Sequence, residues 1–197
     1  MPETPVPGTP APALLPSPGQ TVGPFFHDAL PYPGDRELVP PSTPGAVLLH
    51  GHVRDGAGVG VPDALVEIRQ ADATGTVPAV EGSLHRAGRP FTGWGRSGTD
   101  RTGRYWFRTV EPAPTRPGGA AFLAVAVFAR GLLDRLFTRI YLPGDPAALA
   151  ADPLLSGLDG DARARLTAVR EPDGSLRFDV HLQGPRESVF LTYPGHR

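Results

Sequence analysis

From residue 46 to residue 193, apolar and β-branched residues come in short runs, and each run is bounded by glycine, proline or aspartate. Such runs are typical of short β-strands joined by turns, because the bounding residues favour turns and interrupt helices. Seven or eight short strands at this spacing predict an all-β fold with a β-sandwich core. The clearest predicted strands are residues 47–53, 64–70, 105–110, 121–128, 136–142, 176–182 and 188–193.

Two other local patterns add to this prediction. Thr99–Gly103 carries the residues of a hairpin turn and directly precedes the strand at 105–110. Asp145–Leu166 has an acidic start and pieces rich in alanine and leucine, interrupted by Pro153, so we expect a short helical insertion there. The sandwich is therefore expected to contain one helical segment.

The 25 glycines and 25 prolines among 197 residues reach a proportion at which disorder has to be considered. Hydrophobic residues nevertheless make up 40% of the chain and are grouped, so we interpret the glycines and prolines as turn residues. The exception is the proline-rich start of the chain. We expect residues 1–19 to form an extended N-terminal arm and residues 20–197 to form one β-sandwich domain, with Phe25 or Phe26 fastening the arm.

Charge and cysteine content exclude several classes of function. Lysine and arginine number 19 against 20 acidic residues, so we expect neither nucleic acid nor an anionic membrane as a partner. The chain has no cysteine, which excludes thiolate catalysis and cysteine metal sites. The N-terminus lacks the basic and apolar parts of a signal peptide, and no apolar run approaches the ~18 residues of a membrane span. We therefore expect a cytoplasmic protein.

His50 and His52 stand two residues apart on a predicted strand, so both rings project from one face and could share a metal. The sequence places no third ligand beside them. The remaining histidines, His27, His85, His181 and His196, are isolated, and no known nucleotide-binding or nucleophile motif is present. The residues alone thus leave open an autonomous metalloenzyme that uses His50 and His52, and a purely structural interaction module.

Several segments, taken in order along the chain, resemble the intradiol ring-cleaving dioxygenases. The collinear order, from about Gln20 to Tyr193, makes the resemblance more specific than any one segment could, and it implies the same β-sandwich. The segments are residues 20–26, 51–53 with 66–73, 95–100 with 105–110, and 128–133 with 141–145.

In that family the catalytic subunit holds a non-haem ferric ion through two tyrosines and two histidines. The corresponding positions here are Val77, Thr115, Phe122 and Ala124, none of which can ligate iron. The resemblance therefore implies that this chain binds no metal and supplies no catalytic residue. It is similar to the family's alpha subunit, whose partner, the beta subunit, carries the Fe(3+).

The resemblance also implies a function for the assembled protein. A hetero-oligomer of alpha–beta pairs would cleave 3,4-dihydroxybenzoate with O2 to 3-carboxy-cis,cis-muconate, a step of aromatic catabolism in the beta-ketoadipate pathway, while this chain alone would be inactive. Gly23, Pro24 and Arg130 would bind substrate at the shared site. Gly23 and Pro24 form a flat backbone edge suited to an aromatic ring. Arg130 would balance the substrate's carboxylate or pair with an acid of the partner subunit.

Overall fold

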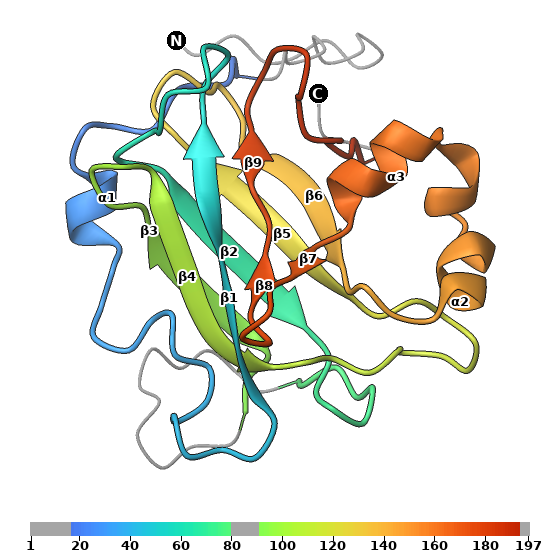
Figure 1. The fold of residues 1–197 in the computed structure, drawn as a ribbon. Helices are drawn as coiled ribbons and strands as arrows, with labels where there is room; N and C mark the ends of the chain where they lie inside the picture. The colour runs from blue at the N-terminus through green and yellow to red at the C-terminus, as the bar shows by residue number, and fades with distance from the viewer. Residues whose placement is uncertain (1–16, 80–90, 194–197) are drawn as a thin grey trace, which may run out of the picture.

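Two packed β-sheets form the part of the chain that the computed structural model describes, residues 17–79 and 91–193 (Figure 1). The five-stranded sheet contains β1 (Ala46–Arg54), β4 (Arg104–Val110), β7 (Val169–Arg170), β8 (Leu176–Arg177) and β9 (Val180–His181). The four-stranded sheet has the order β3 (Trp94–Gly98), β2 (Leu65–Gln70), β5 (Phe122–Phe128) and β6 (Leu136–Tyr141). The predicted all-β sandwich is confirmed.

The core lies between the two sheets, where alternate side chains of each strand point inward. In β5, for example, Leu123, Val125 and Val127 are buried, whereas Phe122 and Ala124 lie on the outer face. Tyr105 and Phe107 of β4 fill the core from the opposite sheet with no exposed surface. Burying a side chain of this size stabilises the fold by about 1.5–3 kcal/mol, so the alternation fixes which face of each strand is left for function.

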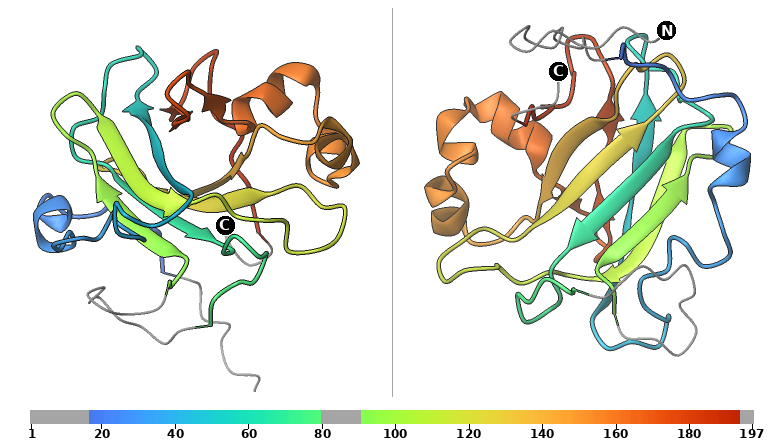
Figure 2. Two further views of the ribbon diagram at one scale, coloured as in Figure 1. Left: turned by 60° about the horizontal axis from the view of Figure 1, so that its bottom comes forward. Right: turned by 180° about the vertical axis from the view of Figure 1, so that it is seen from behind.

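Short helices flank the four-stranded sheet without covering its outer face (Figure 2, right). α2 (Pro146–Ala151) and α3 (Gly160–Leu166) lie at the β6 edge, with a 3-10 turn, η1 (Leu155–Gly157), between them. The aspartates at 145 and 159 cap α2 and α3 by accepting hydrogen bonds from the amides of residues 147 and 162. The expected helical insertion is confirmed. α1 (Phe26–Ala29), which was not expected, lies at the β3 edge.

Residues 176–182 and 188–193 differ from the expected single strands. The first divides into β8 and β9 at Phe178, whose carbonyl lies close to Gly51 of β1 and accepts a hydrogen bond from the Tyr105 hydroxyl. The second forms no regular strand. Its first residue, Ser188, bonds to His181 of β9, whereas Leu191 bonds to Phe137 of β6 in the other sheet. The segment crosses between sheets and cannot build a ladder with either one.

The turn at 99–103 is tight, as expected, but it does not close a hairpin. β3 and β4 belong to different sheets, so the chain crosses the sandwich at this point. The hydroxyl of Thr99 anchors the crossing, since it donates to the Val61 carbonyl at 2.8 Å and accepts from the Ala64 amide at 2.9 Å. Here the turn pattern predicted the local backbone geometry correctly but not the pairing of the strands that it joins.

The predicted N-terminal arm lies almost wholly outside the described residues, as do His85 and His196. Of the two aromatics expected to fasten the arm, Phe26 is buried, and Phe25 is 74% exposed. Among the residues that the structure covers, no helix is long and apolar enough to span a membrane.

Candidate functional site

The two segments that carry the predicted substrate contacts lie against each other. Arg130 belongs to the loop between β5 and β6, where Gly131 takes a positive φ of 91° that only glycine adopts readily. The Gly131 amide donates a 2.7 Å hydrogen bond to the hydroxyl of Thr21, two residues before Gly23. Folding thus brings the Gly23–Pro24 step beside the Arg130 loop, although 110 residues separate Thr21 from Gly131.

A small groove of about 190 Å³ marks the junction of these two segments. Its walls come from the N-terminal segment and from the end of β5 with the loop that follows, and they are about equally polar and apolar. The lining residues are Gln20, Val22, Phe128, Ala129, Leu132, Leu133, Asp134 and Arg135. The groove is too open to enclose a ligand by itself, so any site here needs a further surface to complete it.

Arg130 forms an ion pair with Asp63 of the same chain. The strand register explains this pair, because β2 and β5 are antiparallel with Leu65 opposite Phe128, and two further residues bring Asp63 opposite Arg130. The Asp63 side chain is only 9% exposed, whereas that of Arg130 is 55% exposed. The sequence analysis considered an acid of the partner subunit and missed Asp63, because a single sequence does not fix the register between two strands.

Gly23 and Pro24 present an exposed stretch of backbone at the start of α1. The Gly23 carbonyl accepts a hydrogen bond from the Phe26 amide, which fixes the direction of the segment. A Cβ atom built at Gly23 would meet nothing within 4 Å, so this chain itself gives no steric reason for a glycine at that position. The backbone edge is free to lie against a ligand or a partner chain.

The outer face of β5 carries two of the four positions that correspond to iron ligands in the resemblance. Phe122 and Ala124 both lie on this face, and Ala124 is opposite Arg139 of β6. The guanidinium carbon of Arg139 lies 4.2 Å from the centre of the Phe122 ring, a cation–π contact. A positive charge therefore lies beside the two positions that the resemblance equates with histidine ligands.

A phenol also lies next to Phe122, which sequence reasoning did not anticipate. Tyr141 of β6 is opposite Phe122, and its hydroxyl donates to Asp152 at 2.8 Å and accepts from Arg139 at 2.9 Å. Burial raises the pKa of Tyr141 to about 12. The phenol is thus held protonated at neutral pH and fully engaged, and it cannot act as a phenolate ligand while this network is intact.

The other two positions, Val77 and Thr115, are exposed and lie in loops that touch each other. The Ala113 amide donates to the Asp72 carbonyl at 2.9 Å, so the fold does bring the two loops together. Ferric ion needs anionic oxygen and imidazole donors, and neither side chain provides one. Within residues 17–79 and 91–193, no group of three or more histidine, cysteine or acidic side chains could hold a metal. The residues present do not fit an iron centre.

His50 and His52 share the outer face of β1, as their spacing predicts, but they are bound to different partners. The His50 ring is 3.3 Å from the Ser175 hydroxyl, and burial lowers the pKa of His50. The His52 ring lies 3.6 Å from Asp179, whose carboxylate also accepts from Arg177 at 3.0 Å. The Asp179 carboxylate, the acidic ligand that a metal at His50 and His52 would need, is thus already paired with Arg177.

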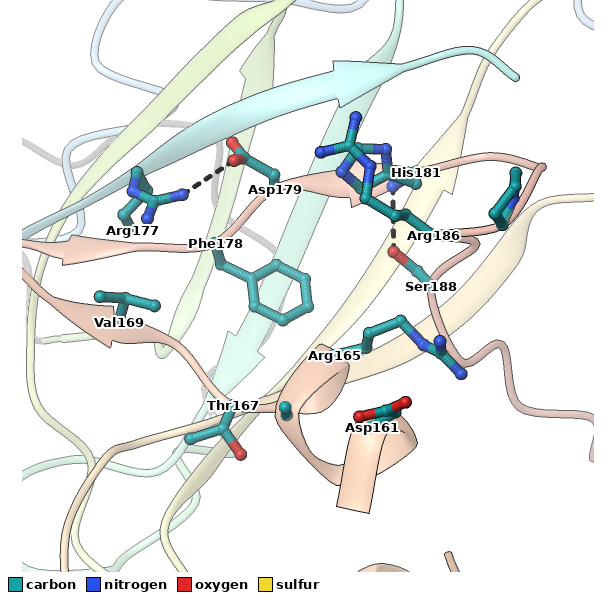
Figure 3. A pocket seen from close by; sticks show the side chains of 12 residues that line it. Asp161, Arg165, Thr167, Val169, Arg177, Phe178, Asp179, His181, Arg186 and Ser188 are labelled. Carbon is teal, nitrogen blue, oxygen red and sulfur yellow. Dashed lines mark hydrogen bonds and ion pairs between the residues drawn. The ribbon is translucent and has the colours of Figure 1, made fainter. Parts of the chain in front are cut away.

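A larger hollow of about 460 Å³ lies between α3 and the β8–β9 segment (Figure 3). Phe178 forms part of its wall, and some of the polar groups are hydrogen-bonded or paired with one another. Arg177 pairs with Asp179 there, and the amide of His181 donates to the Ser188 hydroxyl at 3.0 Å. The predicted substrate contacts Gly23, Pro24 and Arg130 do not line this hollow, and they do not line the smaller groove either, although they flank its lining residues in the sequence. The candidate site therefore rests on the contact between their two segments at Thr21 and Gly131.

Comparisons with known proteins agree with the geometry. A family model described as Dioxygenase matches residues 23–184. The chain is 38% identical over 194 residues to the protocatechuate 3,4-dioxygenase alpha chain of Burkholderia cepacia, covering 90% of this chain and 98% of the relative. It is 36% identical over 155 residues to the beta chain from that organism, covering 70% and 64%.

A solved structure gives the same result at the level of the fold. The dioxygenase domain of a dioxygenase carbohydrate-binding protein fusion from Streptomyces sp. SirexAA-E is 26% identical to this chain, with a TM-score of 0.57. The likeness covers 86% of this chain and 99% of that domain.

Proposed function

The chain belongs to the intradiol dioxygenase family, and on that premise we propose that it is the iron-free alpha subunit of a protocatechuate 3,4-dioxygenase. Members of this family are oxidoreductases that use non-haem iron. The proposed assembly consists of alpha–beta pairs in which the beta subunit ligates the Fe(3+). It opens the ring of 3,4-dihydroxybenzoate with O2 between the two hydroxyl-bearing carbons, giving 3-carboxy-cis,cis-muconate, and this chain alone is inactive.

One observation carries the proposal. The chain is similar to an alpha chain over almost the whole length of both, yet the four positions that the resemblance equates with iron ligands hold Val77, Thr115, Phe122 and Ala124. The structure adds a physical reason, because Arg139 fills the face of β5 beside two of these positions with a cation. A guanidinium in this place repels a ferric ion instead of binding it.

In the proposed assembly, the chain contributes binding and orientation. Gly23 and Pro24 supply a flat backbone edge without a side chain at Gly23 and without an N–H group at Pro24, and the substrate's ring lies against this edge. Arg130 keeps donor N–H groups for the substrate's carboxylate, with which a guanidinium makes charge-assisted hydrogen bonds. The groove between residues 20–22 and 128–135 is closed by the beta subunit, which brings the reacting iron to the substrate.

The proposal is tested by expressing the chain with and without a protocatechuate 3,4-dioxygenase beta chain. We expect the two chains to co-purify as a hetero-oligomer that consumes O2 and forms 3-carboxy-cis,cis-muconate, whereas the chain by itself does neither. Ring cleavage by the single chain contradicts the proposal. So does failure of the beta chain from the same source to bind it.

A further inference from the structure

Asp63 is held firmly in place at the edge of the sandwich. It lies in the turn before β2, directly ahead of Ala64, which is fully buried and whose amide donates to the Thr99 hydroxyl at 2.9 Å. The Asp63 side chain is itself only 9% exposed. Its carboxylate is therefore a fixed point, set by the register of β2 against β5.

Arg130 differs from Asp63 in this respect, because its side chain is 55% exposed and extends from a loop. A long, exposed arginine samples many rotamers, and fixing them upon ligand binding costs conformational entropy. Within the described residues, Asp63 is the one carboxylate that pairs with Arg130. The ion pair orders the guanidinium before any ligand arrives.

We propose that Asp63 is a positioning residue that holds the Arg130 guanidinium at the angle needed to receive the carboxylate of the aromatic substrate. The inference rests on the proposed function, since it takes Arg130 as a substrate contact. A guanidinium has five N–H donors in a planar fork, so one edge can bond to Asp63 while another bonds to a second carboxylate. A lysine has a single ammonium group and no second planar edge, so it could not present separate pairs of N–H donors to two carboxylates in this way.

The negative charge of Asp63 also has an opposing effect, since it repels an anionic substrate. The ion pair with Arg130 largely offsets that repulsion, because the guanidinium lies between Asp63 and the substrate's carboxylate in the proposed complex. Salt weakens the repulsion and also the ion pair, since the Arg130 side chain is 55% exposed. We therefore expect the net effect of Asp63 to favour binding at low and moderate ionic strength.

The test uses the assembled alpha–beta enzyme carrying Asp63→Asn, which keeps the size of the side chain and removes its charge. We expect KM for 3,4-dihydroxybenzoate to rise about 3- to 10-fold with kcat within about twofold, because orientation of the substrate is lost while the iron chemistry stays intact. Inhibition by catechol, which has no carboxylate, should not change. Arg130→Ala should raise KM further, and adding Asp63→Asn to Arg130→Ala should have no additional effect.

Two further variants separate positioning from folding. Asp63→Glu retains the charge and should recover most of the affinity lost in Asp63→Asn. Glu111→Gln removes the carboxylate from another arginine pair, that of Arg170 in β7, and should leave KM unchanged.

An unchanged or lower KM in Asp63→Asn overturns the inference if Arg130→Ala raises KM. If Arg130→Ala itself leaves KM unchanged, Arg130 is not a substrate contact, and that part of the proposed function fails along with the inference. A weakened affinity for catechol in Asp63→Asn also overturns it, because the defect would then not depend on the carboxylate. If Asp63→Asn does not assemble, Asp63→Glu decides the question, since a charge-retaining variant with a raised KM for the acid contradicts positioning by charge.

Discussion

The guanidinium of Arg139 lies over the ring of Phe122 at 4.2 Å, on the outer face of the strand pair β5 and β6. In the resemblance, Phe122 stands at the position of an iron-ligating histidine. The replacement of a metal-donating histidine by Phe122 and the presence of the Arg139 cation thus occur at the same place in the fold. The guanidinium also covers part of the Phe122 ring on this face.

Arg139→Ala should lower the free energy of unfolding of the chain by about 1–2 kcal/mol, since it removes the cation–π contact and the hydrogen bond to Tyr141. Arg139→Lys keeps the charge and loses the planar group, so its free energy of unfolding should lie between those of the unaltered chain and of Arg139→Ala. Urea denaturation monitored by fluorescence measures both. An unchanged midpoint for Arg139→Ala would mean that the contact contributes nothing to stability.

Tyr141 gives the chain a defined sensitivity to alkaline pH. Burial raises its pKa from 10.0 to about 12, so the folded chain holds the phenolic proton more tightly than the unfolded chain does. Raising the pH from 10 toward 12 therefore favours the unfolded state, and stability present below pH 10 is progressively lost. Phenolate absorbance should reveal that Tyr141 ionises together with unfolding, and Tyr141→Phe should reduce the slope of stability against pH. A Tyr141 that titrates near pH 10 in the folded chain contradicts this.

Gly51 is a glycine that the packing requires. A Cβ atom at this position would lie 1.7 Å from the Phe178 carbonyl oxygen, and that oxygen also accepts a 2.6 Å hydrogen bond from Tyr105. Gly51→Ala should cost about 3 kcal/mol or more, because backbone cannot move aside easily. Gly157→Ala is the matched control, since a Cβ there meets nothing within 4 Å. Equal thermal unfolding temperatures for the two variants would contradict the packing described.

Gly23→Ala should separate folding from function. The added methyl group meets nothing in this chain, and we expect the stability of the isolated chain to change by no more than about 0.5 kcal/mol. In the assembled enzyme, however, the methyl would project toward the substrate's ring, and kcat/KM should fall about tenfold or more. An enzyme with full activity would show that the Gly23 backbone does not lie against the ring. The thermal unfolding temperature of the isolated variant is the control.

The strands and the helical insertion could be predicted from the sequence because their signals are local. In residues 64–70, for instance, Val66 and Ile68 alternate with Glu67 and Arg69, and the two apolar side chains are the ones that face the core. Residues 122–128 are apolar throughout, so there the sequence predicts a strand but not which of its faces is buried. The path of residues 188–193 could not be predicted in this way, since Ser188 bonds to His181 of one sheet and Leu191 bonds to Phe137 of the other. The same holds for the turn at Thr99–Gly103, which looks like a hairpin turn and leads from one sheet to the other.

The substrate contacts at Gly23, Pro24 and Arg130 stay predictions, whereas the contacts within the chain at this place were not predicted from the sequence. Gly23, Pro24 and Arg130 were selected on the resemblance, and the Thr21–Gly131 hydrogen bond shows that the fold brings their segments together. Asp63 and Arg139 were not selected, because each acts through a strand register that a single sequence does not fix. Once β2, β5 and β6 are paired, both residues follow from counting along the ladders.

Iron analysis of the purified chain alone and of its complex with the beta subunit tests the account most directly. We predict no iron bound to the chain alone, even after incubation with ferrous iron and air, and one iron for each alpha–beta pair in the complex. The visible absorption of a ferric-tyrosinate centre should appear in the complex only. Stoichiometric iron in the chain alone, lost when Tyr141 or His50 is replaced, would contradict the claim that its partner supplies the metal.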